Sequence, residues 1–160
     1  MNFETIYKDY SPKIYRLCMG YVNDPEWAKD LVQETFVSVW KNLPNFRKEA
    51  AVGTWIFRIA VNNCLRQIDR KKKAEAKMDD IPFVTDDSPP PETQNEQLTF
   101  LRKCIAELKE VDRLIISMTL EEISQKEIGE VLGISEGNVR VKVHRIKEKI
   151  SQKFAKHGQF

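Results

Sequence analysis

The chain has 160 residues, a length that suits one domain of ordinary size or two small ones. Its apolar content of 41% is typical of a globular protein, while 31% of its residues are charged and the net charge is only +2. Residues 1–4 do not resemble a signal peptide, and no apolar run is long enough to cross a bilayer. The sequence therefore excludes a membrane-spanning protein and predicts a cytoplasmic one.

Charge is distributed unevenly along the chain. Residues 74–96 contain seven acids and one base, a net charge of −6, so the rest of the chain carries +8. The prolines and small polar residues of 74–94 cannot bury enough apolar area to fold, and these 21 residues could extend to about 70 Å. We therefore expect two domains, 1–73 and 95–160, joined by a flexible acidic linker over 74–94.

The sequence has few residues of the kinds that form catalytic or metal sites. The three cysteines, Cys18, Cys64 and Cys104, lie far apart within apolar helical patterns, which predicts core packing in a reducing compartment. The sequence has two histidines, no metal-ligand spacing and no glycine loop that could hold a phosphate. We therefore expect no enzyme activity, no catalytic residue, no metal and no cofactor.

Residues 1–73 read as successive helices without an alternating strand pattern, so the predicted fold class is all-α. The first apolar stripe consists of Phe3, Ile6, Tyr7 and Tyr10. Ser11-Pro12 and Asp24-Pro25 each place a capping residue before a proline, which predicts the starts of a second and a third helix. Residues 43–45 should end the third helix, and a fourth should run from about 54 to 73.

The third helix has a buried face with helical spacing, made of Ala28, Leu31, Val32, Thr35, Phe36 and Val39. Four residues are left pointing outward, Asp30, Gln33, Glu34 and Val37. An acidic strip with an apolar residue favours a docking surface for a basic protein partner. A solvated helix surface is the alternative, since exposed acids are common.

The fourth helix combines aromatic, amide and basic residues, namely Trp55, Phe57, Arg58, Asn62, Asn63 and Arg66, and ends in the basic run 70–73. Phe46, Arg47 and Lys48 in the preceding loop could join this surface. Such a mixture suits opened nucleic acid, where bases stack on rings and cations hold phosphates. In the alternative interpretation, the rings belong to the core and the terminal bases complement the helix dipole.

The C-terminal module begins with two apolar helical stripes, Leu98, Leu101, Ile105 and Leu108, then Leu114, Ile115 and Met118. A helix-turn-helix follows. Ser124 and Glu127 form a capping box, Gly133 permits the left-handed conformation that ends the helix, and Ser135 can cap the next one.

The second helix of this motif has a buried face of Val139, Val143, Ile146 and Ile150. The opposite face carries Gly137, Asn138, Val141, His144 and Arg145, flanked by Arg140 with Lys147 and by Lys142 with Lys149. Residues 135–160 hold seven Lys or Arg against two Glu, a net charge of +5. This layout predicts a helix that enters a major groove, with Asn138, Val141 and Arg145 reading bases. A solvated basic face is the alternative.

Three stretches carry a family resemblance: DLVQETF at 30–36, TWIFRIA at 54–60 followed by Asn62, and KEIGEVLGISEGNV at 126–139. In that order, and across such a linker, the chain resembles the extracytoplasmic-function sigma factors, small two-domain members of the sigma-70 family. The resemblance implies binding to the β′ clamp helices and β subunit of bacterial core RNA polymerase, to promoter DNA and to an anti-sigma factor. It implies no small-molecule substrate.

The resemblance also implies roles for individual residues. The polymerase would be bound by Asp30, Gln33, Glu34 and Val37. The minus-ten promoter element would be bound by Phe46, Lys48, Trp55, Arg58, Asn62, Arg66 and Arg70. The minus-thirty-five element would be bound by Ser135, Gly137, Asn138, Arg140, Val141, Lys142, His144 and Arg145. The acidic linker would follow the channel that nascent RNA later occupies.

The chain departs from the family pattern in places: Lys48 and Ala50 lie in a loop that often reads Gly-Glu-Ser after the arginine, and Gly129 and Asn138 replace the common Ala and Thr. The promoter sequence is therefore not carried over. From the residues alone, a stand-alone helix-turn-helix regulator is the main alternative, although it would need a dimer interface or ligand pocket in the first module.

Overall fold

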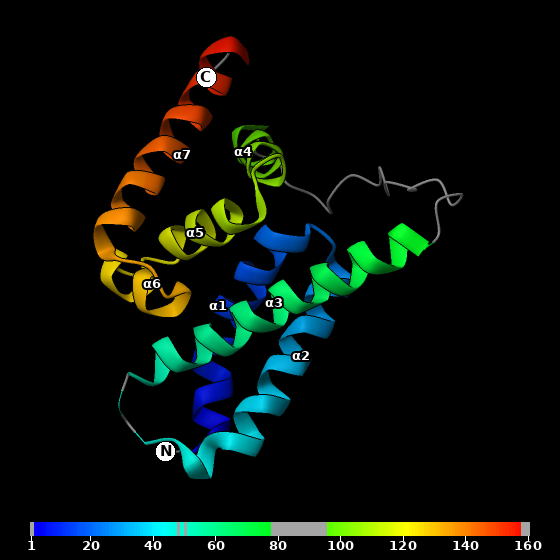
Figure 1. Ribbon diagram of the computed structural model, residues 1–160, viewed down its shortest axis with the longest axis vertical. Coiled ribbons are helices and arrows are strands. Elements are labelled where there is room, and N and C mark those ends of the chain that lie inside the picture. The colour runs from blue at the N-terminus through cyan, green and yellow to red at the C-terminus, as the bar shows by residue number, and fades with distance from the viewer. Residues whose placement is uncertain (1, 48, 50, 78–95, 158–160) are drawn as a thin grey trace.

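The computed structural model describes residues 2–47, 49, 51–77 and 96–157, with the backbone alone for 68–77. Every regular element in these ranges is a helix, which confirms the all-α prediction (Figure 1). In chain order the elements are α1 (Phe3–Val22), α2 (Pro25–Asn42), the short 3-10 helix η1 (Leu43–Asn45), α3 (Val52–Lys77), α4 (Glu96–Ala106), α5 (Glu110–Leu120), α6 (Gln125–Leu132) and α7 (Glu136–His157).

The predicted helix start at Pro12 is wrong, because α1 continues through this residue to Val22. A proline inside a helix costs about 3 kcal/mol, since it removes one hydrogen bond and crowds the preceding turn. Two features offset this cost. Lys8 and Pro12 are both accessible to solvent, so water can solvate the carbonyl left without a donor, and Ile6 and Ile14 are buried on either side of the proline. The stabilisation from burying one continuous apolar stripe therefore outweighs the cost of the proline.

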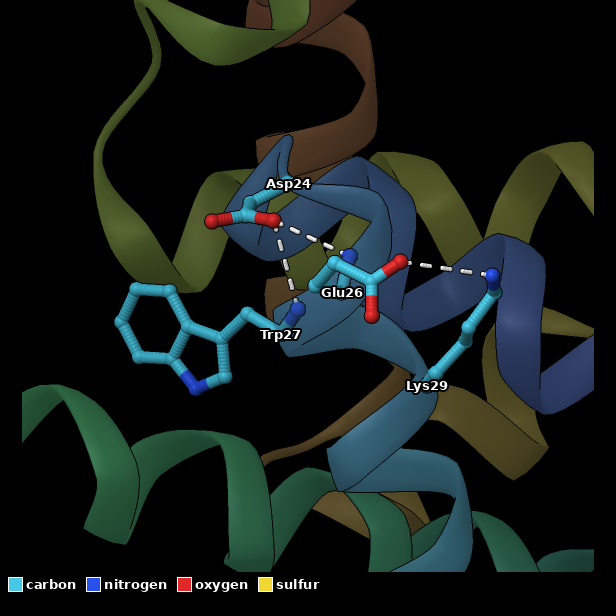
Figure 2. A network of polar contacts seen from close by, with 4 residues as sticks. All are labelled: Asp24, Glu26, Trp27 and Lys29. Carbon is cyan, nitrogen blue, oxygen red and sulfur yellow. Dashed lines mark hydrogen bonds and ion pairs between the residues drawn. The ribbon is translucent and has the colours of Figure 1, made fainter. Parts of the chain in front are cut away.

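The predicted start of the next helix at Asp24-Pro25 is confirmed. The Asp24 carboxylate accepts hydrogen bonds from the backbone N–H groups of Glu26 (3.0 Å) and Trp27 (3.3 Å), as Figure 2 shows. Pro25 occupies the first turn, where its missing N–H costs nothing. Glu26 pairs with Lys29 one turn later at 3.5 Å. These local contacts set where α2 begins and so which of its residues face outward.

Helix α3 begins at Val52 and extends to Lys77, beyond the end predicted near residue 73. Its last residues, 74–77, are Ala, Glu, Ala and Lys, all strong helix formers, and the first proline after them is Pro82. The helix therefore takes up the first residues of the predicted linker. The remainder of that linker, 78–94, lies outside the described residues.

The second group of helices contains the predicted helix-turn-helix, formed by α6 and α7, with α5 packed against both. The apolar residues predicted for α5, Leu114, Ile115 and Met118, are fully buried. In the helix before it, Ile105 is buried but Leu98 is 38% exposed. Within the described ranges, no helix is both long and apolar enough to cross a membrane.

The two groups of helices are packed against each other. Helix α1 lies against α5, and α3 lies against α6 (Figure 1). Buried residues of α1–α3 and of α5–α7 belong to one continuous apolar cluster. We call this contact between α1–α3 and α4–α7 the module seam.

Candidate nucleic-acid and protein interfaces

The outward strip of α2 lies where the sequence predicts it. Asp30, Gln33, Glu34 and Val37 are all exposed, and Val37 has 46% of its surface accessible. The six residues predicted for the opposite face are all buried. One face of α2 thus holds the helix in the core, while the other presents carboxylates and an apolar side chain together. We call these four exposed residues the α2 strip.

Trp40 belongs to the same face and is absent from the sequence-based set. It follows Val37 by one turn, and it is 63% exposed. An indole with this exposure is unusual, since large apolar side chains gain about 1.5 to 3 kcal/mol from burial. Helical spacing from Gln33 and Val37 was the signal that could have found it, because residues 33, 37 and 40 share one side of the helix.

A chain of polar contacts joins α2 to α3 behind the strip. The Thr35 hydroxyl donates to the Leu31 carbonyl at 2.7 Å, and the Asn63 amide donates to the Thr35 hydroxyl at 3.3 Å. Arg66 in turn donates to the Asn63 side-chain oxygen at 2.8 Å. Thr35 and Asn63 are buried, so each contact satisfies a polar atom that water does not reach. Asn63 therefore positions helices and is not part of an outward surface.

A second contact reaches the α2 strip directly. The Gln67 amide donates to the Glu34 carboxylate at 3.1 Å. Together with the Thr35, Asn63 and Arg66 chain, it links the predicted protein-docking face of α2 to the predicted nucleic-acid face of α3. These side-chain hydrogen bonds therefore fix the position of the α2 face relative to the α3 face.

The start of α3 carries an aromatic pair. The rings of Phe46 and Trp55 are stacked, with centroids 4.7 Å apart and planes inclined by 28°. Both residues are at least partly accessible, so the pair keeps an open surface. Phe57 is only 4% exposed and belongs to the core, as the alternative interpretation of this helix proposed. Trp55 and Phe57 therefore differ in role although both are aromatic.

The remaining predicted minus-ten residues are spread along α3. Asn62 and Arg66 are exposed, while Arg58 is half-buried and donates through Nη2 to the backbone carbonyl of Glu130 in α6 at 3.0 Å. Lys48 lies outside the described residues. For Arg70 the structure describes the backbone of α3 and not the side chain. The described members thus form one surface from Phe46 to Arg66, with Arg58 engaged by the other module.

The helix-turn-helix is built from local contacts that the sequence predicts. The Ser124 hydroxyl accepts from the Glu127 N–H at 3.1 Å, and the Ser135 hydroxyl accepts from the Asn138 N–H at 3.1 Å. Gly133 has φ of 73°, and its N–H donates to the Gly129 carbonyl at 2.8 Å. The caps, the left-handed stop and the turn are therefore all confirmed.

Gly129 has a role that the sequence did not reveal. A Cβ atom at this position would lie 2.7 Å from the carbonyl oxygen of Ile134, closer than such atoms approach in folded proteins. The turn folds back so closely on α6 that a side chain would displace it. In contrast, a Cβ atom at Gly137 would meet nothing within 4 Å.

The outward face of α7 is mostly accessible to solvent. Seven of the eight residues predicted to read the minus-thirty-five element are exposed and Lys142 is half-buried. Val141 exposes 47% of its surface although it is apolar. Ion pairs along the helix join Arg140 to Glu136 at 3.9 Å and His144 to Glu148 at 3.3 Å, the latter only when the imidazole is protonated. Such exposed pairs are worth little and can be exchanged for phosphates.

The cysteines pack in the core. All three are buried, and the sulfur atoms of Cys18 and Cys64 lie 3.9 Å apart between α1 and α3. The contact with Cys64 and burial together raise the pKa of the Cys18 thiol well above its ordinary value. Across the described part of the chain, no group of three or more His, Cys, Asp or Glu could hold a metal ion.

Comparison with known proteins finds matches over both modules. Residues 6–74 match the family described as Sigma-70 region 2, and residues 101–150 match Sigma-70, region 4. The ECF RNA polymerase sigma factor SigW of Bacillus subtilis (strain 168) is 31% identical over 160 residues, covering 91% of this chain and 85% of SigW. The ECF RNA polymerase sigma factor SigE of Mycolicibacterium smegmatis is 26% identical; the match covers 98% of this chain and 63% of SigE.

A solved structure shares the fold. The sigma factor RpoE from Bartonella quintana, in complex with the anti-sigma factor NepR, superposes with a TM-score of 0.83 at 18% identity. The superposition covers 98% of each chain, so it includes both modules. The chain thus carries an acidic α2 strip, an aromatic and basic α3 surface and a capped helix-turn-helix, in this order. Together with the matches over both modules, this shows that the chain belongs to the extracytoplasmic-function sigma factors of the sigma-70 family, which direct RNA polymerase to initiate transcription at promoters.

Proposed function

We propose that each of the three surfaces described above has one task in initiation. The α2 strip binds the β′ clamp helices of core polymerase, the surface from Phe46 to Arg66 holds the opened minus-ten element, and α7 reads the minus-thirty-five element. We propose modules over 1–73 and 95–160. The segment 74–94, whose first four residues continue α3, would lead through the RNA channel, where its acids imitate RNA.

Exposure and charge support the docking role of the α2 strip. Asp30 and Glu34 are exposed carboxylates, and Val37 and Trp40 supply exposed apolar surface on the same helix. Interfaces commonly combine a few apolar or aromatic anchors with a charged rim, in which the anchors carry most of the energy and the charges steer association. Trp40 is accordingly the anchor we add to the strip.

Accessible rings and amides support the minus-ten role of α3. Phe46 and Trp55 keep accessible ring surface on which bases can stack, a contact worth about 1 to 3 kcal/mol per base. Asn62 and Arg66 are exposed one turn apart on the same helix and can bind base edges and phosphate. We assign Lys48 and Arg70 to the same minus-ten surface on family resemblance alone.

The basic character of α7 supports the minus-thirty-five role. Asn138 and Arg145 are exposed and can form bidentate hydrogen bonds with adenine and guanine, while Val141 can contact a thymine methyl. Gly137 lies in open space, which allows the helix to approach DNA closely. Arg140 and Lys142 flank this face and can neutralise phosphates.

We also propose an anti-sigma factor as a partner, because the related RpoE was solved with one. A protein that works on bacterial polymerase and promoter DNA acts in the cytoplasm. Its contribution is binding and positioning, so we assign it no catalytic residue, cofactor or small-molecule substrate.

The main support for this function is the exposure of the α2 strip. A binding titration with core polymerase tests its docking role. A variant with Asp30→Arg and Glu34→Arg should bind core polymerase at least tenfold more weakly than wild type, because both charges would then repel a basic partner. The matched control reverses two other exposed acids, Glu4 and Asp9 on α1, and should bind as wild type does. Equal binding by the strip variant and the control would refute the docking assignment.

A further inference from the structure

Arg66, on the proposed minus-ten surface, is held by a neutral partner. Its Nη2 donates to the side-chain oxygen of Asn63 at 2.8 Å, although Arg66 itself is exposed. A guanidinium has five N–H donors, so one such bond leaves donors for a ligand. Because the acceptor is an amide and not a carboxylate, this bond orients the cation without cancelling its charge. The contact can therefore direct Arg66 toward an anion.

Asn63 is itself fixed from the neighbouring helix. It is 5% exposed, and its Nδ2 donates to Oγ1 of Thr35 on α2 at 3.3 Å. Thr35 is fully buried, and its hydroxyl donates to the Leu31 carbonyl at 2.7 Å. Helices α2 and α3 are packed against each other along this contact (Figure 1). The nitrogen side of the Asn63 amide is therefore anchored in the core.

Hydrogen-bond chemistry allows only one orientation of this amide. A threonine hydroxyl has one proton, and Thr35 donates it to Leu31, so toward Asn63 it can only accept. An arginine side chain can only donate. A flipped amide would set its oxygen against the Thr35 oxygen and its NH2 group against the Arg66 donors. The Asn63 oxygen must therefore face Arg66.

We propose that Asn63 is a positioning residue for minus-ten binding: it holds the Arg66 guanidinium so that the remaining donors meet a backbone phosphate of the opened strand. Asn62 lies one turn before Arg66 on the same exposed face, so a base at Asn62 and a phosphate at Arg66 fit one strand running along α3. Arginine matches phosphate geometry with two parallel hydrogen bonds.

The energetic advantage of this arrangement is preorganisation. A long, flexible side chain loses rotamer freedom when it binds a ligand, and the bond to Asn63 restricts Arg66 before the strand arrives. This inference rests on the proposed minus-ten role of α3. It adds a buried residue, which does not touch DNA, to the residues that determine binding of the opened strand.

The test uses the full chain with saturating core polymerase and a template already unpaired at the minus-ten element. Arg66→Ala should weaken binding about three- to tenfold, as expected for one exposed charge-assisted contact. Asn63→Leu removes the acceptor at similar size and should weaken binding about two- to fivefold, because Arg66 keeps its charge but loses its orientation. The double variant should bind as Arg66→Ala does, since the two changes act on one contact.

A second readout locates the phosphate. Methylphosphonate linkages, which are neutral, replace the phosphates of the unpaired strand one at a time. One linkage should weaken binding by the wild-type chain and have no effect on Arg66→Ala. At that linkage alone, Asn63→Leu should lose less affinity than wild type does. A purely structural role of Asn63 would not change the sensitivity to one particular phosphate.

Gln67→Leu is the matched control. Gln67 is also an amide on α3, and it donates to Glu34 on α2 at 3.1 Å. Like Asn63→Leu, this substitution removes an amide and one hydrogen bond between the two helices. Its effect on template binding should add to that of Arg66→Ala, and its methylphosphonate profile should match wild type. Circular dichroism and urea unfolding compare the folding of all variants.

Thr35→Val perturbs the same contact from α2 and guards against a folding defect specific to Asn63→Leu. It removes the acceptor that anchors the Asn63 amide, so it should also weaken binding to the unpaired template. This loss should disappear in the Arg66→Ala background.

Two kinds of failure can be distinguished. Equal losses from Asn63→Leu with and without Arg66→Ala would make Asn63 purely structural and overturn the proposal. So would a methylphosphonate profile that Asn63→Leu leaves unchanged, or wild-type binding by Arg66→Ala. The proposed function itself fails if the wild-type chain gives core polymerase no added affinity for the unpaired minus-ten template, and the role of Asn63 fails with it.

Discussion

The phenyl ring of Phe46 stacks on the indole of Trp55, across the loop that joins η1 to α3, with centroids 4.7 Å apart. Such pairs contribute about 0.5 to 1.5 kcal/mol beyond the burial of their area. The stack therefore anchors the loop on the first turn of α3. It also places two rings, both partly accessible, at one end of the proposed minus-ten surface.

Replacing Trp55 or Asn62 with Ala should impair promoter opening and leave binding to a duplex minus-thirty-five element intact. The defect should disappear on a template already unpaired at the minus-ten element, because the strand no longer has to be opened. Permanganate reactivity of thymines on matched duplex and bubble promoters measures this. Normal opening of the duplex, or an equal defect on the bubble, would favour core packing as the role of these residues.

Substitutions on α7 should separate base reading from phosphate binding. Asn138→Ala or Arg145→Ala should relax discrimination at particular minus-thirty-five bases, by about 1 to 3 kcal/mol for each bidentate pair of hydrogen bonds that the substitution removes. Lys142→Ala or Lys149→Ala should weaken binding to all sequences alike and reduce the salt slope by about 0.9 for each phosphate that is no longer neutralised.

Binding titrations at several salt concentrations, on consensus and single-base variants, provide the measurement for α7. A uniform decrease in affinity from Arg145→Ala, with base preferences unchanged, would assign this residue to the backbone instead.

Gly129→Ala should destabilise the protein, because its Cβ would meet the Ile134 carbonyl at 2.7 Å. We expect the free energy of unfolding to fall by about 1 to 3 kcal/mol, the range for overpacking. Gly137→Ala is the matched control: open space surrounds this residue, and Ala favours the helix by about 0.5 to 1 kcal/mol. Urea unfolding followed by circular dichroism measures both, and an equal stability of the two variants would contradict the close turn.

Thr35→Val should lower the free energy of unfolding by about 1 to 3 kcal/mol, because it leaves the buried Asn63 amide without its acceptor. Thr119→Val is a suitable control, since the Thr119 hydroxyl also donates to the carbonyl four residues earlier but is only half-buried. The difference between the two variants thus reports the hydrogen bond from Asn63 to Thr35, because both variants lose a hydrogen bond to the carbonyl four residues earlier. Similar decreases in both variants would show that the hydrogen bond between Thr35 and Asn63 contributes little.

The Cys18 thiol should react slowly with iodoacetamide in the folded protein. Its raised pKa, caused by the contact with Cys64 and by burial, leaves little thiolate, and the thiolate is the reactive form. Raising the pH toward the elevated pKa should speed the reaction, and unfolding in urea should expose all three thiols. Mass spectrometry of peptides containing Cys18 follows the modification. Rapid labelling of folded protein near pH 7 would show that the core opens readily.

The local signals in the sequence determined much of this molecule. Ser124, Gly133 and Ser135 act through contacts with residues no more than four positions away, and Asp24 caps α2 in the same way. A cap or a left-handed glycine depends on its neighbours in the chain, so the sequence predicts it. The helical spacing of α2 likewise placed its buried and exposed faces, because one periodicity governs both.

Tertiary structure decided what depends on residues far apart in the chain. Pro12 carries a helix-start signal, yet burial of Ile6 and Ile14 against the other helices keeps α1 continuous. The bonds from Arg16 to Glu121 and from Arg58 to Glu130 join positions 105 and 72 residues apart, and no local pattern specifies such partners. Whether a side chain is offered to DNA or held by the other module therefore depends on packing, which the sequence determines only through the whole fold.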